Sequence, residues 1–269
     1  MPRGNAASVR ALADPGSAGG ADGTPACPPS VRPASKRPSV AARWGDLGIR
    51  SLSAVVLAPA VLLCIWFGGV AWQLLIAVAA IGLTIEWLLM TGHARAGDDA
   101  TGLWGPLVFG AFYACVPLAS LDWLRGEGAV GRDDVLFLVA VVWASDIGAY
   151  VVGRLAGGPK LAPAISPGKT WSGAVGGLVI AMLAGAAVAL GLEPGSVVRA
   201  LTIAALLAVV SQAGDLFESW TKRRFGVKDS GRLIPGHGGL LDRLDGLLAA
   251  APVAAALSWA FGRGDVLWK

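Results

Sequence analysis

Residues 173–192 read GAVGGLVIAMLAGAAVALGL, a run of 20 residues that contains no charged side chain. A helix that crosses a bilayer needs about 20 predominantly apolar residues, and this run is long enough. The small residues along it, which let helices approach closely within a membrane, include Gly173, Gly176, Gly177, Ala181 and Gly185. The run therefore predicts a transmembrane helix that packs closely against its neighbours.

The chain as a whole has the composition of a membrane protein. Of its 269 residues, 55% are hydrophobic and only 15% are charged, whereas soluble domains average about 25% charged residues. Apolar runs alternate with short polar connections, and we predict seven spans. They are Leu52–Gly69, Trp72–Met90, Leu103–Leu121, Val135–Val152, Gly173–Leu192, Ala200–Phe217 and Leu244–Phe261. The expected fold class is an all-α, polytopic membrane helical bundle of about seven transmembrane helices.

The N-terminal segment differs from the rest of the chain. Residues 1–45 are rich in Pro, Gly, Ala and Ser and contain no sustained apolar run, so they cannot build a core. They also lack the compact basic, apolar and cleavage regions of a signal peptide. We predict a disordered cytoplasmic tail over residues 1–45 and a transmembrane domain over residues 46–269.

Lysine and arginine are distributed unevenly over the polar connections. When the predicted spans are threaded through a bilayer, most of the 22 Lys and Arg residues fall on the side of the N-terminus. The positive-inside rule makes that side cytoplasmic. The net charge of +4 then reflects orientation, and no nucleic-acid partner is expected. The three cysteines are scattered without CxxC spacing, so no disulfide framework or zinc site is implied.

The stretch Ser211–Gly246 concentrates charges of both signs beside two predicted spans. It reads SQAGDLFESWTKRRFGVKDSGRLIPGHGGLLDRLDG. Residues three, four and seven apart share one face of a helix. The polar residues with this spacing are Asp215, Glu218, Ser219 and Lys222. Such a concentration of charge predicts a site for a charged ligand and a metal.

A second acidic pair, Asp242 and Asp245, follows the glycine-rich segment Pro235–Gly239, which leads into a helix start. Free N–H groups and the helix dipole favour phosphate oxygens at such a place. Carboxylate oxygens are ligands that Mg²⁺ prefers. We therefore predict that carboxylates from two helices hold Mg²⁺ while the loop and nearby cations hold a triphosphate.

These residues resemble the signature of the phosphatidate cytidylyltransferase family. The signature runs from a Ser and a Lys-Arg pair through Lys-Asp to His-Gly-Gly and Asp-Arg-x-Asp. The matching residues are Ser219, Lys222-Arg223, Lys228-Asp229, His237-Gly238-Gly239 and Asp242-Arg243-Leu244-Asp245. Two more stretches resemble the same family: Asp146–Gly153, which reads DIGAYVVG and precedes Arg154, and Ser166–Gly173, which reads SPGKTWSG.

The resemblance implies an Mg²⁺-dependent nucleotidyltransferase of phospholipid biosynthesis, which converts CTP and phosphatidate to CDP-diacylglycerol and diphosphate. It implies a multi-pass protein of a bacterial inner membrane, with the N-terminus and the active site in the cytoplasm. The expected partners are CTP, phosphatidate or a similar lipid phosphate, membrane lipid, and one or two metal ions. A homodimer is compatible with the resemblance.

The residues expected to act in this reaction form three groups. The catalytic residues are expected to be Asp215, Asp242, Asp245 and Lys222, and the metal ligands Asp215, Asp242 and Asp245. The substrate-binding residues are expected to be Asp146, Lys169, Thr170, Ser219, Arg223, Lys228, His237, Gly238, Gly239 and Arg243. A lipid phosphate is already ionised at neutral pH, so His237 is expected to contact the loop or a phosphate rather than act as a general base.

Three other interpretations stay open. A related CTP-dependent transferase would act on a polyprenyl or ether-lipid phosphate. A membrane transporter would carry solute and release no diphosphate, but transporters place polar sites near mid-membrane, whereas these charges cluster on one side. An inactive scaffold is compatible with the segment between Glu86 and Tyr113, which is shorter than is usual in the family. Glu86 itself is interpreted as structural, in a hydrogen bond between helices.

Overall fold

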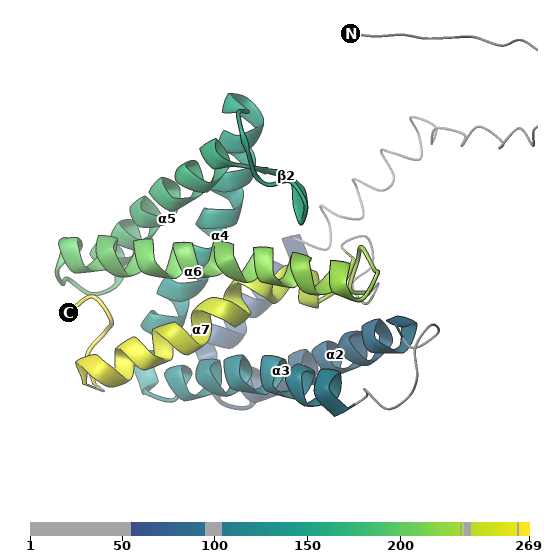
Figure 1. The fold of residues 1–269 in the computed structure, drawn as a ribbon. Coiled ribbons are helices and arrows are strands. Elements are labelled where there is room, and N and C mark those ends of the chain that lie inside the picture. Colours follow the sequence, from purple (N-terminus) through teal and green to yellow (C-terminus); the bar gives the residue numbers. More distant parts are fainter. Residues whose placement is uncertain (1–54, 95–103, 232, 234–237, 263) are drawn as a thin grey trace, which may run out of the picture. The chain divides into compact units, whose positions relative to one another are not determined.

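The computed structural model describes residues 55–94, 104–231, 233, 238–262 and 264–269. The predicted tail and His237 lie outside the described residues. Within them, a short helix, Val55–Phe67, precedes the longer ones. The longer helices are α2 (Gly69–Ala94), α3 (Trp104–Arg125), α4 (Gly128–Ala156), α5 (Trp171–Leu192), α6 (Val197–Arg224) and α7 (Leu241–Phe261) (Figure 1). The predicted all-α bundle of about seven helices is confirmed.

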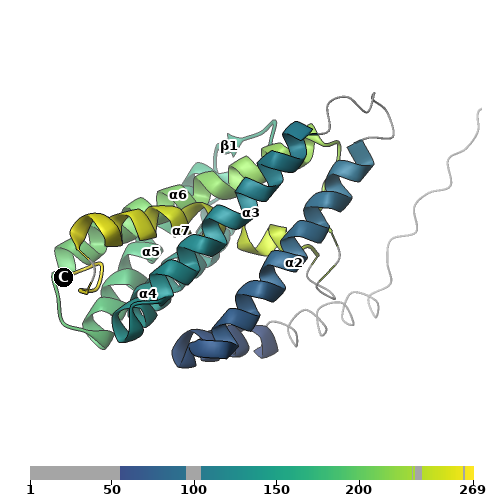
Figure 2. The same cartoon turned by 90° about the horizontal axis from the view of Figure 1, so that it is seen from below.

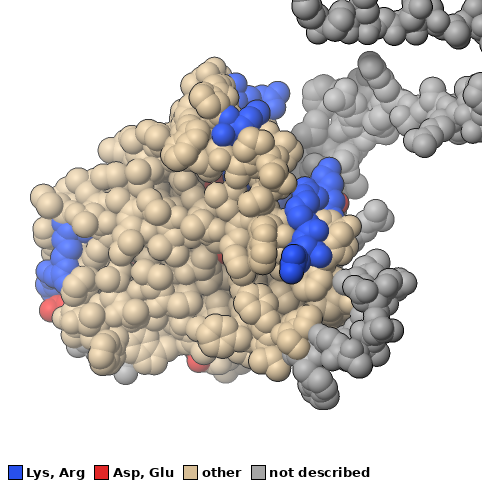
Figure 3. Space-filling view, in the orientation of Figure 1, with Lys and Arg blue, Asp and Glu red and all other residues tan. Residues whose placement is uncertain are grey.

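Six of the helices in the described part of the chain are long and apolar enough to cross a membrane, while Val55–Phe67 is apolar but shorter. Figure 3 shows Lys and Arg side chains gathered in separate patches, with a broad uncharged surface between them. Such a surface suits a bilayer, because charged groups are costly in hydrocarbon whereas apolar side chains are not. The chain is a multi-pass membrane protein.

The helix α6 is longer than the span predicted for it. It continues beyond Phe217 to Arg224, through the charged residues of its last turns. Hydropathy marks only the apolar part of a helix, whereas backbone hydrogen bonding can continue into polar surroundings. The extension places Glu218 and Lys222 on the same helix as Asp215.

The segment between the predicted spans Leu103–Leu121 and Val135–Val152 is mostly helical, because α3 and α4 both extend beyond the apolar runs. Asp122 belongs to α3 and accepts a hydrogen bond from Trp72 Nε1 at 3.1 Å. Asp134 belongs to α4, which starts at Gly128, and accepts one from the Leu267 backbone N at 2.8 Å. Each of these two carboxylates therefore accepts a hydrogen bond from another segment of the chain.

A small antiparallel hairpin, which the sequence did not predict, connects α4 to α5. Its strands are β1 (Lys160–Ala162) and β2 (Ser166–Thr170), and Lys160 lies opposite Thr170. Thr170 is also the N-cap of α5, because its Oγ1 accepts a hydrogen bond from the Gly173 N at 3.1 Å. The hairpin thus fixes Lys169 directly before the first turn of α5.

Small residues allow α5 to lie close to its neighbours. The buried residues of α5 recur every four positions and are Gly173, Gly177, Ala181, Gly185 and Ala189. A Cβ at Gly173 would lie 2.7 Å from Ala149 O, and one at Gly177 would lie 2.6 Å from Ser145 O. Only glycine fits at these two contacts with α4, and Figure 1 shows the helices converging beside the hairpin. The close packing predicted for this span is confirmed.

The remaining helices bring distant parts of the sequence to the hairpin. The helix α6 contacts α4, α5, α7 and β2, while α3 contacts both α7 and α2. Figures 1 and 2 show α2 and α3 side by side, with α6 and α7 beside each other. The end of α4, the hairpin, the C-terminal half of α6 and the start of α7 therefore meet in one region.

Candidate active site

A cavity of about 710 Å³ lies where α4, the hairpin, α6 and α7 meet. All three stretches singled out in the sequence contribute to its wall. The charged residues that line it are Asp146, Arg154, Lys160, Lys169, Asp215, Lys222, Asp242, Arg243 and Asp245. Cations and acids are thus interspersed, which suits a ligand that carries several negative charges and binds together with a metal ion.

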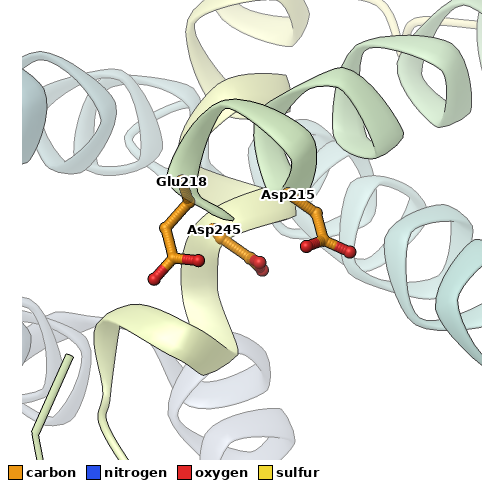
Figure 4. A group of neighbouring side chains, drawn as sticks. All are labelled: Asp215, Glu218 and Asp245. Atoms are coloured by element: carbon orange, nitrogen blue, oxygen red, sulfur yellow. The ribbon is translucent and has the colours of Figure 1, made fainter. Parts of the chain in front are cut away.

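An acidic cluster adjoins the cavity and consists of Asp215 and Glu218 of α6 and Asp245 of α7; Asp215 and Asp245 line the cavity itself. One carboxylate oxygen from each lies within 4.8 Å of the others, and Figure 4 shows the three side chains directed toward a common space. Glu218 is only 2% exposed. Its Oε2 forms an ion pair with Lys222 Nζ at 2.7 Å, and among the described residues no group donates a well-aligned hydrogen bond to either oxygen.

Two glycines allow these helices to approach closely enough to bring the acids together. A Cβ at Gly214 of α6 would lie 3.0 Å from Asp245 O, and it would also collide with the Ala249 side chain. A Cβ at Gly246 of α7 would collide with Ser211 Oγ. Each glycine adjoins an acid in sequence, so the same contact that joins the helices also places Asp215 and Asp245 face to face.

Asp242 is engaged differently from the other acids. Its Oδ1 accepts a hydrogen bond from Lys222 Nζ at 2.6 Å, and its Oδ2 accepts from the backbone N of Ser230 at 3.2 Å and of Gly239 at 3.3 Å. Lys222 therefore bridges Asp242 and Glu218. Asp242 as a metal ligand stays a prediction, and the geometry shows it holding both Lys222 and the loop before α7.

The other sequence-predicted residues divide between the cavity wall and its surroundings. Asp146, Lys169, Thr170 and Arg243 line the cavity. Ser219, Arg223 and Lys228 are not among its lining residues in the part of the chain that the structure describes. Gly238 and Gly239 lie in the loop before α7, where Gly238 has a φ of 86°. Their assigned roles stay predictions.

The structure adds residues that the sequence-based site omitted. Glu218 joins the acidic cluster, and its signal was the three-residue spacing from Asp215. Arg154 and Lys160 line the cavity as further cations. Arg154 lies one helical turn after Tyr150, and its Nη1 is 3.4 Å from the Tyr150 hydroxyl, to which it donates. The position of Lys160 depends on the unpredicted hairpin, so sequence reasoning had no signal for it.

The fold and the cavity define a membrane-embedded protein with a polar site suited to a phosphate-bearing ligand. Residues 87–261 match the cytidylyltransferase family. The chain belongs to that family.

Curated relatives agree with this assignment. The chain is 39% identical, over 267 aligned residues, to a phosphatidate cytidylyltransferase of Brucella abortus biovar 1 (strain 9-941), with 82% of this chain and 97% of the relative covered. It is 38% identical to one from Pseudomonas aeruginosa, over 74% of this chain and 80% of the relative. It is 34% identical to one from Rickettsia bellii, over 77% of this chain and 89% of the relative.

Proposed function

We propose that this protein is a phosphatidate cytidylyltransferase, which forms CDP-diacylglycerol and diphosphate from CTP and phosphatidate. The observation that carries the proposal is the cavity in which Asp215 and Asp245 of the acidic cluster face several cations at one end of membrane-spanning helices. The family membership and the names of the relatives support the same reaction. A nucleotide and a lipid phosphate both need such a site, because each brings negative charge to the edge of the membrane.

In this reaction a phosphate oxygen of phosphatidate forms a bond to the α-phosphorus of CTP. The bond between that phosphorus and the bridging oxygen breaks, and diphosphate leaves with the electron pair. Such transfers depend on alignment and on neutralising phosphate charge rather than on covalent chemistry by the protein. Lys169, Lys222 and Arg243 line the cavity and are suited to the triphosphate. They would neutralise charge that builds up on the leaving diphosphate.

The donor set fits a divalent cation. Asp215, Glu218 and Asp245 offer only carboxylate oxygens, which Mg²⁺ prefers, and the buried Glu218 has no aligned hydrogen-bond donor among the described residues. We assign these three residues to the ion, with Asp242 as the residue that orients Lys222. A bound Mg²⁺ would supply positive charge to the phosphate oxygens during transfer.

The lipid phosphate is best accommodated on the α4 side of the cavity. Tyr150 and Arg154 line the cavity there. Ile147 and Leu155 on the same helix are exposed apolar residues, and Tyr150 itself is exposed. Acyl chains could therefore remain against the apolar helix surface while the headgroup reaches Arg154. This arrangement supports entry of the lipid from the bilayer and of the nucleotide from water.

We further propose that the protein lies in a bacterial inner membrane with the cavity toward the cytoplasm. The basis is the positive-inside rule, since the end that carries the hairpin also carries Arg154, Lys160, Lys169 and Lys222. This orientation gives the site access to CTP.

The test of this function is incubation of the purified full-length protein with radiolabelled CTP, Mg²⁺ and phosphatidate. We expect a labelled CDP-lipid and an equal amount of diphosphate, both absent when EDTA is added. Parallel reactions contain a polyprenyl phosphate or an ether-lipid phosphate. Transfer to one of these with none to phosphatidate would assign a different lipid substrate. Proteoliposomes that show solute flux and no diphosphate release would contradict the enzymatic proposal.

A further inference from the structure

The side chain of Glu86 in α2 is fully buried and reaches the start of α7. Its Oε1 accepts a hydrogen bond from the Leu240 backbone N at 2.7 Å, and its Oε2 accepts one from the Leu241 backbone N at 2.7 Å. Oε2 also accepts a hydrogen bond from Ser230 Oγ at 3.1 Å. One carboxylate thus binds the loop before α7 and the first N–H groups of that helix.

These contacts supply a cap that α7 does not provide for itself. The first N–H groups of a helix have no partner within the helix, and a polar side chain at the N-cap usually satisfies one of them. The N-cap residue of α7 is Leu240, which makes no side-chain capping bond. Glu86 takes over this function from another helix. Its negative charge also lies at the positive end of the helix dipole.

Two glycines in the loop leave room for this carboxylate. A Cβ at Gly231 would lie 2.8 Å from Glu86 Oε1, and a Cβ at Gly239 would lie 2.9 Å from Glu86 Oε2. Gly239 belongs to the family signature, and any larger residue there would also crowd Asp242, whose Oδ2 would be 3.0 Å away. The same Cβ would collide with Ser230 Oγ, so the requirement for glycine at this position follows from Ser230 and from two carboxylates that converge on the same backbone.

The helix that carries Glu86 is itself held in place. The neighbouring Trp87 donates a hydrogen bond from Nε1 to Pro106 O at 2.8 Å. Its indole lies against Gly110, where a Cβ would collide with the ring. Trp87 also contacts the ring of Phe225, just beyond α6, in an edge-on geometry. Glu86 therefore projects from a fixed point toward the loop.

The contacts continue from Glu86 to the acidic cluster. Ser230, which donates its hydroxyl to Glu86, also donates its backbone N–H to Asp242. Asp242 holds Lys222, and Lys222 pairs with Glu218. We propose that Glu86 is a positioning residue of the active site, which fixes the start of α7 so that Asp242 holds Lys222 and Asp245 meets Asp215. This role rests on the proposed function, although its effect on metal binding can be measured independently.

The experiment compares Glu86→Gln with the wild type in detergent-solubilised full-length protein. Glutamine keeps the size of the side chain but presents an NH₂ group to one of the donors that the carboxylate accepts. Residues that orient metal ligands typically change metal affinity or activity about 10- to 100-fold when they are substituted. We expect Mn²⁺ affinity, measured by electron paramagnetic resonance, and kcat for CTP to fall by about tenfold in a variant that is still folded at the assay temperature. We expect Glu86→Asp, which keeps the charge, to recover part of both losses.

The matched control is Thr91→Val in the same helix. Thr91 is also buried, but among the described residues its hydroxyl donates only to the carbonyls of Trp87 and Leu88 within α2. We expect wild-type Mn²⁺ affinity and kcat from this variant. Ser230→Ala gives a second test if Glu86→Gln does not fold, and it should weaken Mn²⁺ binding measurably because it removes the hydroxyl that links Glu86 to the loop.

The results separate a positioning role from simple stabilisation. Lower melting temperatures with unchanged Mn²⁺ affinity and kcat, in Glu86→Gln or, if that variant does not fold, in Ser230→Ala, would overturn the proposal. If the wild type transfers no cytidylyl group but Mn²⁺ affinity still depends on Glu86, the proposed function fails while the positioning role holds.

Discussion

Lys169 of the hairpin forms an ion pair with Asp215 of α6. Both side chains are partly exposed to the cavity, and the pair joins the SPGKTWSG segment to the acidic cluster. Under the proposed function, we expect Lys169 to exchange this carboxylate for a phosphate of the substrate. A metal ion bound to Asp215 would neutralise the carboxylate and so weaken its ion pair with Lys169.

The first prediction concerns Lys169→Ala. The variant should fold and insert normally, because a partly exposed ion pair contributes only about 0.2–1 kcal/mol to stability. Its KM for CTP or for phosphatidate should rise, since a phosphate would lose a cationic partner. Steady-state kinetics with each substrate varied in turn provide the measurement. Lys269→Ala, which removes a lysine that pairs with Glu193 and lies outside the cavity, should behave like the wild type.

The fold was largely predictable from sequence because hydropathy and length report directly on bilayer-spanning helices. The predicted run Gly173–Leu192 nearly coincides with α5. The continuation of α6 to Arg224 was not predictable in this way, because charged residues there interrupt the apolar pattern without interrupting the helix. The hairpin was missed because its strands are short and depend on the elements around them.

The site was predictable where the spacing along one helix brings residues together. It was less predictable where contacts between different segments determine which residues are neighbours. The spacing of Asp215 and Glu218 suggested a shared face, and the structure shows both in the acidic cluster. The different contacts of Asp242 and Asp245 could not be predicted from the sequence, because both acids lie in the first two turns of the same helix. They arise because Lys222 and the loop before α7 contact Asp242, whereas Asp245 lies beside Asp215 and Glu218.

The second prediction separates these acids by metal binding. Asp215→Asn, Glu218→Gln and Asp245→Asn should each weaken Mn²⁺ binding. The two aspartate variants should also lose about a hundredfold in turnover, as expected for loss of one electrostatic contact to a transition state. Asp242→Asn should lower turnover by releasing Lys222 but keep most of the Mn²⁺ affinity. Isothermal titration calorimetry measures the Mn²⁺ affinity of each variant, and steady-state assays measure its turnover. If Asp242→Asn loses as much affinity as Asp245→Asn, Asp242 belongs to the metal site, as the sequence predicted.

The third prediction concerns orientation. In a background in which Cys27, Cys64 and Cys115 are replaced by serine, Lys228→Cys should react with an impermeant maleimide only after spheroplasts are permeabilised. Asp265→Cys, near the C-terminus, should react in intact spheroplasts. Both native residues are exposed, so access depends on the side of the membrane rather than on burial. The reverse pattern would place the cavity outside the cell and away from CTP.

The fourth prediction concerns the C-terminal segment, whose buried residue Trp268 does not line the cavity. Trp268 is fully buried, stacks on Phe137 with ring centroids 5.0 Å apart, and donates from Nε1 to Glu193 O at 2.8 Å. Trp268→Ala should lower the free energy of unfolding by about 3–5 kcal/mol, as is typical for a large buried aromatic residue. Thermal unfolding in detergent measures the change. Trp259→Ala, at a position that is 73% exposed, should have little effect.

The last prediction tests whether the contact between α6 and α7 determines the geometry of the acidic cluster. Gly246→Ala would place a Cβ against Ser211 Oγ and push the two helices apart next to Asp245. We expect lower thermal stability together with weaker Mn²⁺ binding, because separation of the helices also separates Asp245 from Asp215. Gly105→Ala is the control, since a Cβ there meets no atom within 4 Å, and it should leave both quantities unchanged or slightly raise stability. A Gly246→Ala variant that loses stability but binds Mn²⁺ as tightly as the wild type would show that the cluster tolerates a wider helix separation. In that case, side-chain flexibility rather than close helix packing would bring the three carboxylates together.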